Sequence, residues 1–199
     1  MAAVREVVRS GQIGDVYAAD LVFHNAYGPD KAWFRDPVLS GGGCVIDLGI
    51  HLVDLALWML DRPKVEEVTA RLFAAGRPAA AGGAVAEDHA VARLDLASGA
   101  TVTLACSWYL PAGRDAVIAA TFYGSGGAVA LTNVDGSFYD FRAERYQGTS
   151  RTLLAEPPDA WGGRAVVDWA RRLGQSARFD PAAEEIVDVA AVLDRMYGR

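Results

Sequence analysis

The sequence has little lysine, little cysteine and no signal-peptide-like start. Lys31 and Lys64 are the only lysines, and 25 acidic residues outnumber 19 basic ones, which gives a formal net charge of -6. Nucleic acids and anionic membrane surfaces require a basic patch, so this balance disfavours both as partners. The first ten residues carry charges throughout and lack the apolar stretch of a signal peptide. These absences favour a small-molecule or protein partner in the cytoplasm.

The two cysteines, Cys44 and Cys106, lie in apolar segments and do not have the spacing of metal ligands. We therefore expect buried, reduced thiols and neither a disulfide nor a zinc site. With 199 residues and 52% hydrophobic content, the chain is long enough to bury one substantial core. We expect a single domain over residues 1–199.

Hydrophobic periodicity predicts helices near both ends of the sequence and consecutive strands between them. Strands that follow one another across short turns indicate an antiparallel sheet, so the pattern favours an α+β fold over an alternating α/β fold. The segment 74–86, rich in Ala, Gly and Pro, is expected to form a long flexible hairpin loop. Predicted strands cover 16–23, 65–73, 89–96, 101–108, 117–123 and 128–131; predicted helices cover 4–8, 44–60, 165–173 and 181–197.

Asp47, His51 and Asp54 are spaced i, i+4 and i+7, which places them on one face of the helix predicted after Gly43. Nearly every other position of this helix is apolar, so we expect this polar stripe in or beside the core. Three interpretations are open. His51 could be a core histidine held by one carboxylate while Asp54 pairs with an arginine. The three side chains could instead bind a metal ion, or form an acid–base site that opens onto a pocket.

Three consecutive glycines, Gly41, Gly42 and Gly43, precede this helix. Glycine costs backbone entropy and gives up side-chain packing, so such a run is worth tolerating where a ligand approaches the backbone at a helix N-terminus. The run favours the acid–base interpretation. Because no further cluster of strong ligands occurs in the sequence, we predict no metal site.

The segment Gly41–Asp54, GGGCVIDLGIHLVD, resembles the GGGxxxDxGxHxxD signature of the Gfo/Idh/MocA oxidoreductases at every fixed position. Residues 10–14 resemble the SGxIG turn of that family, and Glu87-Asp88 resembles its ED before a strand. Trp33 and Arg35 stand where its WR pair precedes the glycines. The similarity covers essentially the whole chain and implies the C-terminal domain of such an enzyme. The implied fold is a large, mostly antiparallel, open-faced sheet with helices packed on one face.

The resemblance implies chemistry at a hydroxyl carbon of a sugar, cyclitol or similar polyol, with NAD or NADP as cofactor. It assigns His51 as the general acid or base and Asp47 as the residue that binds or orients the substrate hydroxyl. It leaves supporting roles to Asp54 and the three glycines.

Trp33 and Arg35 are candidates for substrate binding, because an aromatic plane suits a sugar ring and a guanidinium suits its oxygens. Core packing and a solvated ion pair are the alternatives for these two residues. Tyr27, Lys31 and Tyr109 are further substrate-binding candidates.

No strand–GxGxxG–helix unit is present, because the glycine-rich residues 124–127 lie between two predicted strands. The sequence therefore predicts no Rossmann domain, and residues 1–14 are expected to be the remnant of a connection from a missing dinucleotide-binding domain. That domain could belong to a separate chain. We also expect a homo-oligomer, with exposed apolar surface on the first helix around Val4, Val7 and Val8 and on the last around Ile186, Val189, Leu193 and Met196.

Two other functions are compatible with the sequence. A stand-alone copy of this domain could be a non-catalytic dimerisation or ligand-binding module. A metal-dependent isomerase or lyase using Asp47, His51 and Asp54 is a third hypothesis.

Overall fold

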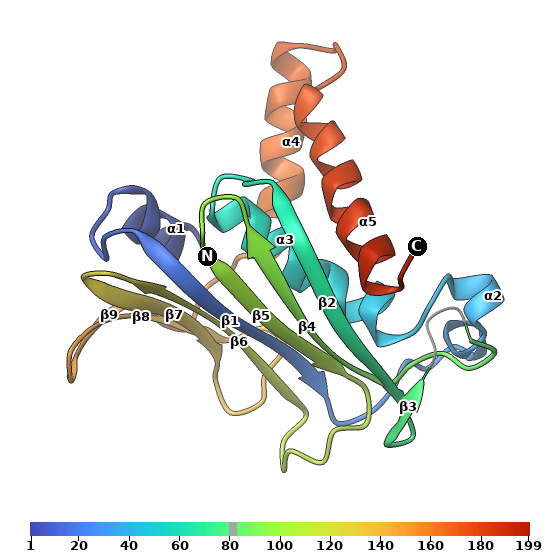
Figure 1. Cartoon of the computed structure of the whole chain (residues 1–199). Coiled ribbons are helices and arrows are strands. Elements are labelled where there is room, and N and C mark those ends of the chain that lie inside the picture. Colours follow the sequence, from blue (N-terminus) through green and yellow to red (C-terminus); the bar gives the residue numbers. More distant parts are fainter. Residues whose placement is uncertain (80–82) are drawn as a thin grey trace.

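The computed structural model describes residues 1–79 and 83–199 and is organised around one nine-stranded sheet (Figure 1). The strand order is β3-β2-β4-β5-β1-β6-β7-β8-β9. Among the described residues, β1 and β5 pair in parallel and every other neighbouring pair is antiparallel. The strands are β1 (Val16–Asn25), β2 (Val65–Ala74), β3 (Arg77–Ala79), β4 (His89–Leu96), β5 (Thr101–Ser107), β6 (Ala116–Gly124), β7 (Gly127–Asn133), β8 (Phe141–Gln147) and β9 (Ser150–Ala155).

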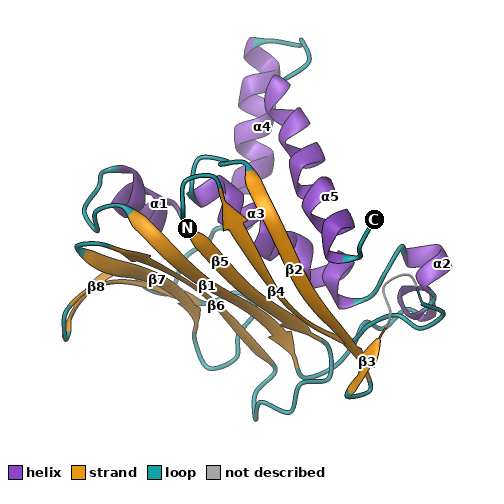
Figure 2. Ribbon diagram, in the orientation of Figure 1, coloured by secondary structure: helices purple, strands orange, loops and turns teal. Residues whose placement is uncertain are grey.

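Helices cover one face of the sheet and leave the other face open in the described part of the chain (Figure 2). Helix α1 contacts β7, β8 and β9, α3 contacts β1 and β5, and α5 contacts β2. The predicted α+β class is therefore confirmed. The helices are α1 (Ala2–Arg9), α2 (Pro37–Ser40), α3 (Ile50–Met59), α4 (Arg164–Gln175) and α5 (Glu185–Met196), with 3-10 turns at Ala32–Arg35 and Pro181–Glu184 and a π-helical turn at Val45–Gly49.

The alternation of buried and exposed side chains along β1 shows which face of the sheet is covered by helices. Successive strand side chains point to opposite faces, so Ala19 and Leu21 face the helices while Asp20 and Val22 face the open side. Leu21 pairs with Leu104 on β5, and both are at most 3% exposed. Burying a side chain of this size contributes about 1.5–3 kcal/mol, so this row fixes the core beneath α3.

The first residues of the chain belong to the core. Val4 and Ile13 are fully buried, and Val7 is 4% exposed. The expected exposed apolar surface at Val4 and Val7 is therefore wrong, because α1 turns these residues towards β7, β8 and β9. On α5 the same expectation is wrong for Val189, Leu193 and Met196, which pack against α3 and β2. It is confirmed for Ile186, which is 67% exposed. Whether residues 1–14 continue from another domain stays a prediction.

A further exposed apolar surface, not predicted, lies on α4. This helix has no buried residue, and Val166, Trp169 and Leu173, spaced i, i+3 and i+7, are 66%, 56% and 44% exposed. Upstream of α4, Trp161 Nε1 donates to the carbonyl of Tyr139 at 2.7 Å. Figure 1 shows α4 and the N-terminal half of α5 extending away from the sheet. We call the stripe Val166, Trp169 and Leu173 the α4 stripe.

Part of the predicted hairpin loop over 74–86 is regular structure. β2 continues to Ala74, and Arg77–Ala79 pair with it as β3. The part of the prediction that falls on residues 80–82 lies outside the described residues.

The segment Pro37–Met59 is long and apolar enough to span a membrane by length and composition alone. In the fold it supplies α3, whose residues Leu52, Val53 and Leu57 are at most 3% exposed beneath the sheet. This burial is typical of the core helix of a globular domain.

Candidate functional site

The signature segment begins with the turn Gly41–Gly43, which is packed against Tyr197 and Glu87. Gly41 has a φ of 82°, a left-handed conformation that favours glycine. A Cβ on Gly42 would overlap the Tyr197 side chain, and a Cβ on Gly43 would overlap the backbone of Glu87. The expectation that Gly42 and Gly43 leave space for a ligand at this helix N-terminus is therefore wrong, because the protein itself fills that space.

Asp47 is held by a tryptophan that sequence reasoning did not select. It lies in the π-helical turn Val45–Gly49, and its Oδ2 accepts a hydrogen bond from Trp108 Nε1 at 2.9 Å. Trp108 follows β5 directly and is 4% exposed. Its backbone N–H donates to the Asp88 carbonyl at 2.7 Å. Both ends of this side chain are thus fixed, and π-helical turns are frequent at functional sites.

His51 lies on the first turn of α3 and is exposed, with its ring centroid 6.1 Å from that of Phe23. The expected burial of the polar stripe is wrong for His51 and for Asp54, both of which are exposed to solvent. Asp54 Oδ1 accepts from Arg62 Nη2 at 2.9 Å, so the expected pairing of Asp54 with an arginine is confirmed. Arg62 also bonds Glu185, which ties Asp54 to α5 and assigns it a structural contact.

Arg35 and Tyr109, both predicted, are brought together at the end of the sheet. Arg35 Nε donates to Tyr109 Oη at 3.2 Å, and its Nη2 donates to the Pro29 carbonyl at 2.8 Å. Tyr109 has a φ of 61°, which is uncommon for a residue with a side chain and occurs often at functional sites. Since Tyr109 follows Trp108, one peptide links this pair to the indole that holds Asp47.

The other three substrate-binding candidates lie at the surface. Trp33 stacks on Phe34 with ring centroids 3.9 Å apart, and the Tyr27 ring lies 6.3 Å from that of Phe138. Lys31 is exposed. Hydrogen bonds between the described residues do not connect these three side chains to Asp47 or His51, and their role in binding stays a prediction.

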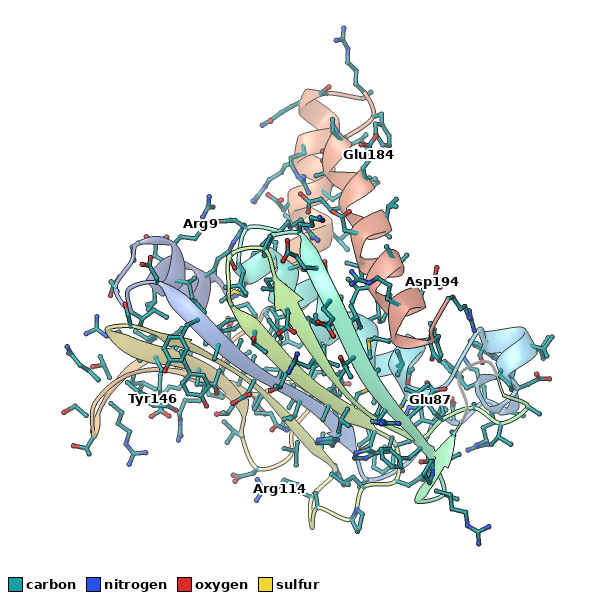
Figure 3. The ribbon with its side chains drawn as sticks, in the orientation of Figure 1. Arg9, Glu87, Arg114, Tyr146, Glu184 and Asp194 are labelled. Atoms are coloured by element: carbon teal, nitrogen blue, oxygen red, sulfur yellow. The ribbon has the colours of Figure 1, made fainter. Side chains whose placement is uncertain are left out.

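Glu87 is a buried carboxylate, 4% exposed, that holds the start of the signature helix. Its Oε1 accepts from Gly43 N at 2.9 Å, from Val45 N at 3.0 Å and from Tyr197 Oη at 2.7 Å. Figure 3 shows Glu87 near the C-terminal end of α5. The only signal for Glu87 in the sequence was the ED pair, and Tyr197 gave none.

The described residues do not fit a dinucleotide by themselves. A pyrophosphate needs free amide donors at a helix N-terminus, but Gly43 and Val45 already donate to Glu87. The glycine-rich residues 124–127 form the hairpin between β6 and β7, without the strand-to-helix turn of a dinucleotide fingerprint.

No cluster of three or more His, Cys, Asp or Glu side chains within the described ranges could hold a metal ion. Cys44 and Cys106 are buried free thiols, as predicted, with their Sγ atoms 3.8 Å apart. On the open face, His24 Nδ1 lies 2.8 Å from Ser107 Oγ and the His24 ring stacks on His89. Burial and then the neighbouring His89 lower the pKa of His24.

A shallow trough of about 500 Å³ crosses the open face of the sheet, lined in part by Asp20, Arg71 and Thr103. It lies on the opposite side of the sheet from Asp47 and His51. Around His51 the surface is open to solvent. The geometry therefore supplies one wall of a site: an anchored carboxylate, an exposed imidazole on the following turn, and the Arg35–Tyr109 pair nearby.

A family model described as the GFO/IDH/MocA C-terminal domain matches residues 1–130 of this chain. D-glucoside 3-dehydrogenase of Escherichia coli (strain K12) is 37% identical over 71 residues, which are 35% of this chain and 20% of that protein.

The fold is shared with solved oxidoreductases. GenD2 from gentamicin A biosynthesis, in complex with NAD, is 25% identical with a TM-score of 0.71; the match covers 100% of this chain and 58% of GenD2. Aldose-aldose oxidoreductase from Caulobacter crescentus, complexed with glycerol, has a TM-score of 0.76 at 19% identity over 100% of this chain and 58% of its own. Levoglucosan dehydrogenase, in complex with NADH and L-sorbose, has a TM-score of 0.75 at 16% identity over 99% of this chain and 59% of its own. The last two show likeness of fold alone. The chain thus spans less than two thirds of each of these relatives.

Proposed function

This chain belongs to the GFO/IDH/MocA oxidoreductase family, and we propose that it is the substrate-side domain of an NAD(P)-dependent enzyme. The proposed reaction takes place at a hydroxyl carbon of a sugar, cyclitol or similar polyol. The observation that carries the proposal is the carboxylate of Asp47, anchored by Trp108, one turn before the exposed imidazole of His51. Relatives that act on a glucoside or are complexed with L-sorbose or glycerol support the substrate class.

The proposed chemistry of this chain is proton transfer. Oxidation of an alcohol requires a base for the hydroxyl proton, and imidazole can take and return a proton near neutral pH. His51 is the proposed base in oxidation and the acid in reduction. Asp47 uses Oδ2 for Trp108, which leaves Oδ1 to accept the substrate hydroxyl and orient it. Arg35 and Tyr109 are proposed to bind further hydroxyl oxygens.

The cofactor is proposed to be held by residues outside this chain. The described residues offer no cradle for a pyrophosphate, since the amides of Gly43 and Val45 are taken by Glu87. A dinucleotide-binding domain, in the same longer protein or in a separate chain, would also close the open side of the site beside His51. We propose that residues 1–14 form the connection to it.

The proposed docking surface for that domain is the α4 stripe. The stripe is exposed and α4 has no buried residue, which fits a surface that takes a protein partner.

The same stripe supports a second candidate function, a non-catalytic dimerisation module in which the stripe pairs with that of another copy. An exposed Trp and two aliphatic side chains are unusual on a helix without a partner.

Replacing Trp169 and Leu173 with serine is expected to abolish self-association of the purified chain while leaving its unfolding midpoint nearly unchanged. Both residues are exposed in the single chain, and surface substitutions usually change stability by only about 0.5 kcal/mol. Analytical ultracentrifugation over a dilution series measures the effect. Arg171→Ser, at an exposed position on the same helix, is the matched control. A wild-type chain that stays monomeric at every concentration contradicts the dimerisation module but not the enzyme.

A binding experiment tests the proposed function. The isotopically labelled chain is titrated with glycerol, L-sorbose, D-glucose and myo-inositol, and separately with NAD⁺, NADH, NADP⁺ and NADPH. We expect saturable shifts of the His51 and Trp108 side-chain resonances with at least one polyol, weakened in Asp47→Asn, and no shifts with the dinucleotides. Polyols that shift neither resonance up to their solubility limits contradict the substrate assignment. Saturable dinucleotide binding contradicts the location of the cofactor outside this chain.

A further inference from the structure

We propose that Glu87 and Tyr197 are positioning residues of the candidate site. Together they hold the Gly41–Gly43 turn from the inside and, with Asp88 and Trp108, set the place of the Asp47 carboxylate. The role of this site in substrate binding and proton transfer rests on the proposed function. The position of the Asp47 carboxylate, in contrast, can be measured without an activity assay.

The first contact is between Glu87 and the start of the signature helix. The first amides of a helix have no intrahelical partner, and a carboxylate that accepts from them fixes where the helix begins. Glu87 Oε1 accepts from Gly43 N and Val45 N, and the Glu87 carbonyl accepts from Cys44 N at 2.9 Å. Three consecutive backbone amides are thus bound to one residue. Asp47 lies only two residues further on.

The second contact comes from the end of α5. Tyr197 is 4% exposed and donates its hydroxyl to Glu87 Oε1 at 2.7 Å. Burial and then the charge of Glu87 raise the pKa of Tyr197, so its hydroxyl stays a donor. The ring fills the space where Gly42 lacks a side chain. Arg199 continues this cover, with Nη2 3.4 Å from the Gly41 carbonyl.

The third contact joins Glu87 to the partner of Asp47. The next residue, Asp88, accepts from the Trp108 backbone N–H at 2.7 Å and, through Oδ2, from Ala75 N at 2.8 Å. Two consecutive residues therefore hold both the helix that carries Asp47 and the indole that bonds it. Without the hydrogen bonds of Glu87, the helix that carries Asp47 is no longer fixed relative to Asp88, which holds Trp108. The 2.9 Å hydrogen bond between Trp108 and Asp47 should then lengthen or break.

A buried hydrogen-bonded group stabilises a fold wherever it lies, so loss of stability alone does not identify a positioning residue. The distinguishing property is a change at Asp47 within the folded state. The Trp108 indole N–H reports on it directly, because its resonance depends on the hydrogen bond to Asp47.

The experiment records the indole N–H resonances of the chain labelled with ¹⁵N-tryptophan. Trp108→Phe assigns the Trp108 signal, and Asp47→Ala gives its position without the hydrogen bond. Glu87→Ala removes the acceptor of the hydrogen bonds from Gly43 N, Val45 N and Tyr197 Oη, and Tyr197→Phe removes one donor while keeping the ring. Under conditions where the variants are folded, we expect Glu87→Ala to move the Trp108 signal most of the way towards its Asp47→Ala position and Tyr197→Phe to move it part of the way.

The matched control is Asn133→Ala, which removes a side chain with three hydrogen bonds, to Ile118 N, Ala116 O and Ser137 O. It is expected to lower the unfolding midpoint and leave the Trp108 resonance in place. If Glu87→Ala and Tyr197→Phe also leave that resonance in place, the positioning role is overturned. Failure of the proposed function would appear elsewhere, as unchanged activity in His51 variants, and would not alter this result.

Discussion

Replacing His51 with glutamine is expected to lower kcat by roughly 10²- to 10⁴-fold, the factor that a positioned general acid or base contributes. The assay uses an enzyme assembled from this chain and a dinucleotide-binding domain, with the reduced nicotinamide followed by its absorbance. Because His51 is exposed on α3, the substitution should leave the unfolding midpoint almost unchanged. The loss should therefore reflect proton transfer and appear mainly in kcat, with a smaller change in KM.

Two aspartate variants sharpen this prediction. Asp47→Asn keeps the size of the side chain but removes the charge that the Trp108 indole bonds, and we expect it to raise KM as well as lower kcat. Asp54→Asn is the matched control, since Asp54 lies on the same helix and pairs with Arg62. It should keep kcat within about twofold, as expected for a surface ion pair of small energy. Near-wild-type activity in both His51→Gln and Asp47→Asn would refute the proposed catalytic pair.

The Gly43→Ala variant is expected to lose about 3 kcal/mol of unfolding free energy, at the upper end of the cost of inserting a methyl group into packed structure. The added Cβ would meet the backbone of Glu87, which cannot rotate away like the end of a side chain. Relief of that overlap would also lengthen the hydrogen bond from Gly43 N to Glu87 Oε1. Urea unfolding followed by circular dichroism measures the loss.

Gly162→Ala is the control for Gly43→Ala, since a Cβ on Gly162 has no neighbour within 4 Å. It should change the unfolding free energy by no more than about 0.5 kcal/mol. A Gly43→Ala protein with the wild-type midpoint would show that the turn yields easily, and it would also weaken the positioning role of Glu87.

The sequence predicted the central strands well because their side chains alternate. His89–Leu96, for example, was predicted with the bounds that the structure gives it. β8 (Phe141–Gln147) is not predicted because Arg142, Glu144 and Arg145 give it the polarity of a loop, and Ala143 is its only fully buried residue. β9 is largely exposed and has little apolar pattern from which to predict it.

The sequence identifies the main residues of the candidate site but does not predict their geometry. The spacing of Asp47 and His51 identified both residues. Spacing alone predicts a regular α-helix, whereas the π-helical turn Val45–Gly49 changes the rotation of Asp47 relative to His51. Burial of the stripe was predicted from the apolar composition of the helix, whereas the position of the sheet decides which face is covered.

The supporting contacts could not be predicted because they are long-range. Trp108 meets Asp47 across 61 residues of sequence, and Tyr197 meets Glu87 across 110. No local sequence pattern predicts a contact between residues so far apart in the chain. The apolar stripe of α4, by contrast, has a helical period that is visible in the sequence.

Although β1 is the first strand in the sequence, it lies in the interior of the sheet between β5 and β6. His24 on β1 pairs with Ser107 on β5, 83 residues away, so this contact closes a long loop and should form late during folding. Without β1, the pairings of the other strands give only two smaller sheets, β3-β2-β4-β5 and β6-β7-β8-β9, with unpaired edges at β5 and β6. We therefore expect the insertion of β1 to limit the folding rate and to set how long those edges can pair with another copy and aggregate.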